Sequence, residues 1–243
     1  MLTELVNHKM GWSGIALETL ELIRQFLNRD LYPFLPGEGS VGGLGVEGHL
    51  AMAMIGEGTF FVDGKRTPAR DVLEQEGLEP RVLECKEGLS LLDGCISALA
   101  ISIPPLYDCI NAMKTADIAC ALSFEALRST TKTLDERIYE HKQHLGDRAS
   151  AENLRRLTAG SEILESARDL KVQDAYVTRC APRVHGAGKK IVVEAYDAIM
   201  RELNSCQDNP QIYENGTEDG ECLMSGNFDA TGMAIHTDFL CSA

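Results

Sequence analysis

Three side chains at a regular spacing of three residues are suited to holding a carboxylate. Gln173, Tyr176 and Arg179 stand at i, i+3 and i+6, so one helical face or turn presents all three. The fork of N–H groups on a guanidinium pairs with both oxygens of a carboxylate. The pattern therefore predicts a carboxylate site centred on Arg179. The alternatives are a structural ion pair of Arg179 with Asp93 or Asp174, and a core position for Tyr176.

Other segments that resemble chemical motifs are weaker candidates. The glycine-rich residues 37–45 have no Lys-Ser or Lys-Thr after them, so we interpret them as a flexible turn and not as a phosphate loop. The eight cysteines form no C-x-x-C pair, which argues against a metal site. His141 and His144 lie in a polar stretch and are expected at the surface. His185 lies on a helical segment and is expected either in the core or in a pocket.

The charge balance limits the classes of partner. The chain of 243 residues carries 23 Lys and Arg against 37 Asp and Glu, a formal charge of −14. Such an acidic chain repels phosphate backbones, so we expect no nucleic-acid partner. The N-terminus shows no basic region followed by an apolar run, and Asp93, Asp108 and Pro104-Pro105 interrupt the most apolar stretch, 88–110. We therefore expect no membrane span and a cytoplasmic protein with reduced thiols.

The spacing of apolar residues predicts a mainly helical chain with two small β-hairpins. Helices are expected after an N-cap at Ser13 and over residues 50–55, 68–77, 86–100, 111–128 and 183–205. Pro104-Pro105 predicts a break or kink between the helix over 86–100 and the helix over 111–128. The hairpins are expected around the Asp63-Gly64 turn and across Asn215-Gly216.

Two further segments have predicted surroundings. The polar stretch from Thr130 to Ser161 is predicted to be surface. The segment from Met233 to Leu240 is apolar, and we expect a partner surface to cover it, with a frayed terminus as the alternative.

Several separated motifs occur together and in one order. They are Gly39-Ser40-Val41-Gly42, Ile55-Gly56-Glu57-Gly58, Gly77-Leu78-Glu79-Pro80, residues 86–92 (KEGLSLL), residues 173–180 (QDAYVTRC), Asp208-Asn209-Pro210 and Ser225-Gly226-Asn227-Phe228. In this order they resemble the histidine and phenylalanine ammonia-lyase family over nearly the whole chain. The chain itself resembles only the central half of a full member. The resemblance implies a mainly α, fumarase/aspartase-like helical-bundle fold, here as a single partial domain over residues 1–243.

The resemblance also implies a set of site residues. Family members form a methylidene-imidazolone (MIO) electrophile from an internal Ala-Ser-Gly, and the matching triplet here is Gly43-Leu44-Gly45. Leucine has no hydroxyl to lose as water, so we expect no MIO and no other cofactor. Tyr176 matches a catalytic position. The substrate-binding positions implied by the resemblance are Asp93, Gln173, Arg179, Asn227 and Phe228, of which Asp93 replaces an asparagine and Phe228 is alternatively a core aromatic.

These observations leave three functional hypotheses. The first is one subunit of a split, heteromeric lyase-like enzyme for an amino acid or related carboxylate, with a second chain supplying the N- and C-terminal parts of the family. The second is a non-catalytic structural or regulatory homologue. The third is a truncated histidine ammonia-lyase remnant. The first two hypotheses predict an oligomer. The family resemblance itself predicts that Asp93 and Arg179 lie in one pocket, close enough to interact.

Overall fold

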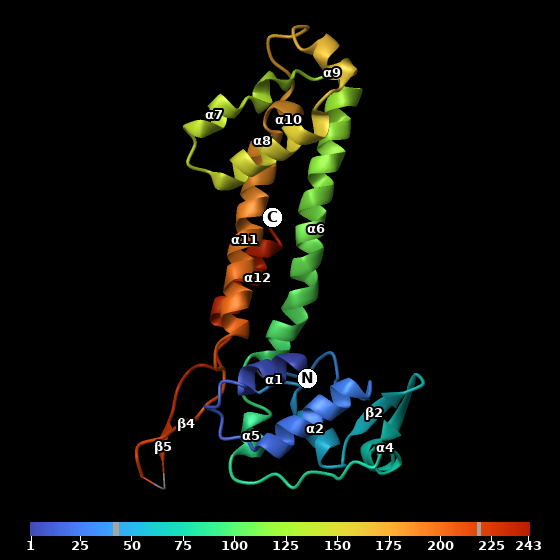
Figure 1. Cartoon of the computed structure of the whole chain (residues 1–243), viewed down its shortest axis with the longest axis vertical. Helices are drawn as coiled ribbons and strands as arrows, with labels where there is room; N and C mark the ends of the chain where they lie inside the picture. The colour runs from blue at the N-terminus through green and yellow to red at the C-terminus, as the bar shows by residue number, and fades with distance from the viewer. Residues whose placement is uncertain (41–43, 218–219) are drawn as a thin grey trace. The chain divides into compact units, whose positions relative to one another are not determined.

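The chain forms two compact units in the computed structural model, which describes residues 1–40, 44–217 and 220–243. The first unit comprises Met1–Ser102 and Ala198–Ala234, and the second comprises Ile103–Asp197 and Ile235–Ala243. Helices dominate both units, as the sequence predicts (Figure 1).

The helices of the first unit surround one apolar core. They are α1 (Leu2–His8), α2 (Leu17–Asn28), α3 (Gly48–Met54), α4 (Ala69–Glu76) and α5 (Glu87–Ser90). Ile23 and Phe26 of α2 are fully buried, and the Phe26 ring meets Phe60 edge-on at 5.1 Å between centroids. Burial of this apolar face holds α2 in place, because its isolated 12-residue helix would be marginal in water.

Both predicted hairpins are present in this unit. Strands β2 (Thr59–Val62) and β3 (Lys65–Pro68) pair antiparallel across Asp63 and Gly64, whose positive φ values of 50° and 75° fit a type I′ turn. A short strand β1 (Tyr32–Pro33), absent from the sequence-based expectation, adds to the edge of β2. Strands β4 (Gln211–Tyr213) and β5 (Glu221–Leu223) form the second hairpin.

The second unit contains most of the two longest helices, the C-terminal part of the first and the N-terminal part of the second. Its elements are most of α6 (Ile96–Ala126), the 3₁₀ turn η1 (Thr131–Leu134), α7 (Glu136–Glu140), α8 (Leu145–Thr158), α9 (Glu162–Ala167), α10 (Tyr176–Arg179), most of α11 (Ala181–Leu203) and the end of α12 (Thr231–Leu240). Phe124, Leu134, Leu154 and Leu164 form its core. Gly146 and Gly186 let α8 and α11 cross closely, since a Cβ on Gly146 would lie 2.1 Å from the carbonyl oxygen of Gly186.

The predicted helix break at Pro104-Pro105 is wrong, because α6 runs through both prolines. Each proline lacks an N–H, which frees the carbonyl groups four residues earlier. Both prolines are exposed, and the apolar side chains of Leu99 and Leu106 on either side are buried, so packing outweighs the lost bonds. The predicted helix over 86–100 is instead divided, with Gly94 at φ 127° between α5 and α6.

The predicted N-cap of α2 and the predicted surface stretch also need correction. The N-cap is Ala16 and not Ser13, and the Glu87 carboxylate accepts hydrogen bonds from Ala16 N at 3.0 Å and Thr19 Oγ1 at 2.5 Å. A side chain 71 residues away therefore performs the capping. Residues 130–161 include η1, α7 and α8, and they bury Leu154 in the core and Asp147 in an ion pair with Arg183 at 3.0 Å.

Two apolar surfaces remain open. Met233 of α12 is buried, whereas Ile235 and Phe239 are about half exposed. Among the described residues, α6 is the one helix long and apolar enough to cross a bilayer by length and composition. A single such helix is weak evidence for a membrane span, and an exposed apolar helix face equally suits contact with another protein.

Candidate functional site

Three of the predicted site residues lie together in the second unit, with Gln173 just before α10 and Tyr176 and Arg179 at its two ends. Arg179 Nη1 donates to Gln173 Oε1 at 2.7 Å, and the Arg179 Cζ atom lies 5.8 Å from the centroid of the Tyr176 ring. Tyr176 is 73% exposed, so the alternative of a core aromatic is wrong for this residue. Gln173 occupies one Nη of Arg179, and within the described residues the Nε and Nη2 donors have no hydrogen-bond partner.

The altered loop lies in the first unit, where Leu44 pairs with Asp93. These two residues form an isolated antiparallel bridge, and Gly45 N donates to Leu92 O at 3.4 Å. Gly43 lies outside the described residues. The side chain of Leu44 is 45% exposed and carries only methyl groups at its end. A cyclised electrophile needs a serine hydroxyl that leaves as water, so the residues at this place do not fit an MIO group.

Asp93 is a buried acid with an incomplete set of partners. Burial is the largest cause of a raised pKa of Asp93, and the nearby Asp208 carboxylate raises this pKa further. A hydrogen bond from Asn209 opposes the shift. Within the described part of the chain, its Oδ2 has no hydrogen-bond partner. Asp208 is itself paired with Lys86 at 2.5 Å. The folded protein therefore favours the protonated form of Asp93 more strongly than water favours the protonated form of a surface aspartate.

The segment that holds Asn227 and Phe228 is connected to Asp93 through Asn209. Asn227 Nδ2 donates to Cys206 O at 3.0 Å, and Ser225 N donates to Asn209 Oδ1 at 2.7 Å. Asn209 thus connects this segment to Asp93. Phe228 is half-buried. The pairing of Asp93 with Arg179 stays a prediction, since the two residues belong to different units.

Sequence reasoning missed Glu47, which lies beneath the altered loop. Its Oε1 accepts the N–H of Ser97 in the first turn of α6, and the whole residue is 5% exposed. A Cβ added to Gly45 would lie 1.8 Å from Glu47 Oε2, an oxygen without a hydrogen-bond partner among the described residues. Nothing in the sequence signals this contact, because Glu47 and Ser97 are 50 positions apart.

A second missed group is a polar cluster on the helices of the second unit. Asp117 of α6 is fully buried and accepts from Asn153 at 2.7 Å, from His185 at 2.8 Å and from Lys189 at 2.5 Å. Burial alone would raise the pKa of Asp117, but these three partners outweigh it and the pKa is lowered. The cluster joins α6, α8 and α11 and places His185 as a structural partner of Asp117.

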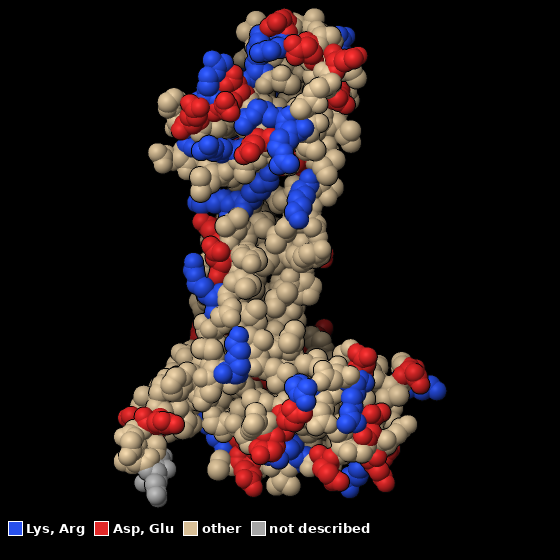
Figure 2. All heavy atoms as spheres, viewed as in Figure 1, with Lys and Arg blue, Asp and Glu red and all other residues tan. Residues whose placement is uncertain are grey.

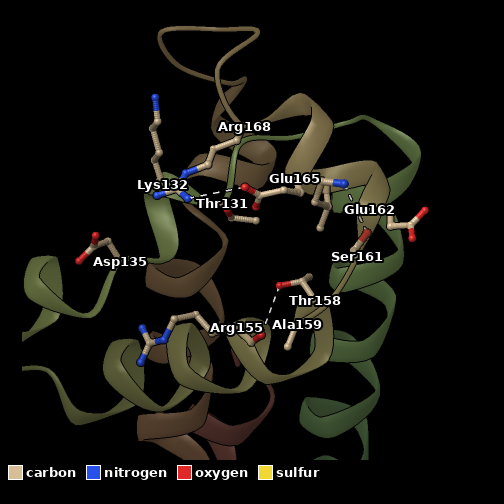
Figure 3. A pocket seen from close by; sticks show the side chains of 12 residues that line it. Thr131, Lys132, Asp135, Arg155, Thr158, Ala159, Ser161, Glu162, Glu165 and Arg168 are labelled. Atoms are coloured by element: carbon tan, nitrogen blue, oxygen red, sulfur yellow. Dashed lines mark hydrogen bonds and ion pairs between the residues drawn. The ribbon is translucent and has the colours of Figure 1, made fainter.

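A hollow in the second unit does not coincide with the predicted site. It has a volume of about 510 Å³ and opens between η1, α8 and α9, where Arg168 pairs with Glu165 at 4.0 Å (Figure 3). Its cations already have partners, such as Leu134 O for Arg155 Nη1 at 2.6 Å. Among the described residues, no group of three His, Cys, Asp or Glu side chains is arranged to hold a metal ion.

Comparisons with known proteins agree with this fold. The pattern of the aromatic amino acid lyase family matches residues 1–243, and the chain belongs to that family. It is 41% identical to a histidine ammonia-lyase of Alkaliphilus oremlandii and 37% identical to one of Symbiobacterium thermophilum, over 95% and 96% of its length. It spans only 45% and 46% of those relatives, about half their length.

Solved structures give the same family fold. Histidine ammonia-lyase from Trypanosoma cruzi superposes with a TM-score of 0.87 at 33% identity, over 99% of this chain and 45% of that one. A tyrosine aminomutase from Streptomyces globisporus superposes with a TM-score of 0.89 at 29% identity, over 98% and 48%. The chain is therefore a mainly α, partial lyase-like protein with the ammonia-lyase fold.

Proposed function

We propose that the chain is one subunit of a heteromeric, lyase-like enzyme that holds an amino acid or a related carboxylate at Arg179. The observation that carries the proposal is the arrangement of Gln173, Tyr176 and Arg179, in which the guanidinium keeps a free fork at an exposed surface. Family membership supports it, since the curated relatives are histidine ammonia-lyases.

The chemistry proposed for this chain is binding and orientation. Leu44 offers no leaving hydroxyl, so no step is assigned to an electrophile at residues 43–45. Arg179 binds the ligand carboxylate, Gln173 holds the guanidinium plane, and the Tyr176 hydroxyl is the candidate proton-transfer group. The second chain supplies the rest of the site. The free thiols of all eight cysteines suit the cytoplasm.

An exposed apolar face supports association with another chain. Figure 2 shows few charged side chains over the middle of α6, where Ile103, Tyr107, Ile118 and Leu122 are exposed on one side of the helix. Burying such side chains stabilises a complex by about 1.5–3 kcal/mol each, before the cost of association. Their number favours a lasting complex over a free monomer.

A binding experiment tests the role of Arg179. L-Histidine and L-histidinamide are titrated into the protein, with the Arg179→Gln variant for comparison and Arg24→Gln, an exposed arginine paired with Glu21, as the control. We expect wild type and the control to prefer the carboxylate and Arg179→Gln to lose that preference. Equal preference in all three proteins would contradict the proposal.

Light scattering tests the second chain. The protein is measured alone and mixed with the product of a neighbouring reading frame that resembles the other lyase segments. We expect a larger, stoichiometric complex in the mixture.

A second candidate function is that of a non-catalytic structural relative. Glu47 favours it, because its buried carboxylate joins the residues beside the altered loop to the first turn of α6. This function predicts assembly without a preference for the carboxylate. A monodisperse monomer that does not bind the product of the neighbouring reading frame would contradict both functions.

A further inference from the structure

The segment that carries the predicted carboxylate site is fastened at both ends to the turn η1. Asp174, the residue after Gln173, has a side chain only 5% exposed, and its Oδ2 accepts the N–H of Thr130 at 2.5 Å. At the other end, Thr133 Oγ1 donates to the carbonyl oxygen of Arg179 at 2.9 Å. The two contacts enclose the residues between Gln173 and Arg179.

The turn that receives these contacts is itself fixed. Thr130 Oγ1 donates to Arg168 O at 2.9 Å and accepts from Lys132 N at 3.4 Å as the N-cap of η1. Leu134, at the end of the turn, is fully buried in the core of the second unit. The turn is thus a rigid support, because its backbone is held by hydrogen bonds and its last side chain by packing.

Asp174 has the chemistry that such an anchor needs. Its second oxygen, Oδ1, accepts from Lys171 Nζ at 2.9 Å, so the buried carboxylate is paired. A hydrogen bond from a backbone N–H to a carboxylate is stronger than one between neutral groups. Loss of the carboxylate leaves the N–H of Thr130 without its acceptor, which is costly in a buried place.

We propose that Asp174 and Thr133 are positioning residues that set the spacing of Gln173 and Arg179 and so aim the Arg179 guanidinium at a ligand carboxylate. The orientation of the guanidinium toward a ligand rests on the proposed function of Arg179. The attachment of residues 173–179 to η1 does not depend on that function. Gln173 and Arg179 are six residues apart, and their 2.7 Å hydrogen bond requires a defined path for the chain between them. A misplacement of about 1 Å in such a group costs up to about 100-fold in function.

Hydrogen exchange measured by mass spectrometry tests the anchoring without any ligand. The variants are Asp174→Ala and Thr133→Val, which remove the contacts, and Asp174→Asn and Thr133→Ser, which keep an acceptor or a hydroxyl. We expect faster exchange in residues 173–180 for the first pair, wild-type exchange for the second pair, and unchanged protection of α8 in all four. Unchanged exchange in 173–180, or equal loss of protection in α8, would overturn the anchoring.

The affinity ratio of L-histidine to L-histidinamide tests the aim of the guanidinium. We expect Asp174→Ala to reduce this ratio by about tenfold or more and Asp174→Asn to restore most of it. A ratio unchanged in Asp174→Ala but lost in Arg179→Gln would overturn the positioning role and leave the proposed function intact. A ratio unchanged in Arg179→Gln would overturn the proposed function, and the exchange result would then decide the anchoring by itself.

Discussion

Replacing Asp93 with asparagine is expected to stabilise the protein at neutral pH. Asp93 is 6% exposed, its Oδ2 has no hydrogen-bond partner among the described residues, and the Asp208 carboxylate lies nearby. Asparagine has nearly the same volume and no charge, so it avoids both the burial of an anion and its repulsion by Asp208. An unsatisfied buried polar group costs about 1–3 kcal/mol. We expect a net gain of about 1–2 kcal/mol, since the new amide also needs partners.

The pH dependence of this gain has a definite sign. Burial and Asp208 raise the pKa of Asp93 in the folded protein, so the folded state favours the protonated acid. The stability that this acid contributes is fully present below the unfolded pKa of about 3.9, and it is lost as the pH rises through the folded pKa. Wild type and Asp93→Asn should therefore be similar in acid and differ most near pH 7.

Urea unfolding followed by circular dichroism, at several pH values between 4 and 7, measures the difference in the free energy of unfolding. In thermal unfolding, at about 2–4 °C per kcal/mol for a chain of this size, the melting temperature at pH 7 should rise by about 2–8 °C. Asp108→Asn is the control, since Asp108 is exposed on α6 and its replacement should change little. A variant less stable than wild type at pH 7, or a difference independent of pH, would refute the reasoning.

Three further predictions concern other parts of the molecule. Asp117→Ala removes the buried acceptor of the half-buried Lys189 and His185 side chains and should lower the free energy of unfolding by about 3–5 kcal/mol in urea titrations. Gly146→Ala puts a Cβ 2.1 Å from Gly186 O and should destabilise by about 1–3 kcal/mol, whereas Gly226→Ala, which meets nothing within 4 Å in the described structure, should not. Intact mass spectrometry should show no loss of water at Leu44, and a dehydrated, cyclised species would contradict the prediction of no MIO.

Local features of the fold were predictable from the sequence because their causes are local. The Asp63-Gly64 turn needs two residues that tolerate positive φ, and the structure has both at φ 50° and 75°. The helices α4 and α11 follow the apolar spacing within their own residues. The sequence likewise places Gln173 and Arg179 in one short segment, but their 2.7 Å hydrogen bond depends on the path of the chain between them.

Tertiary structure decided the features whose partners are distant in the chain. The capping of α2 by Glu87, the contact of Glu47 with α6 and the cluster around Asp117 join residues 36 to 72 positions apart. No periodicity or turn chemistry encodes such pairs, because a buried polar group acquires its partner only when the elements pack. The passage of α6 through Pro104-Pro105 has the same origin, since burial of the neighbouring leucines outweighs a local preference to break the helix.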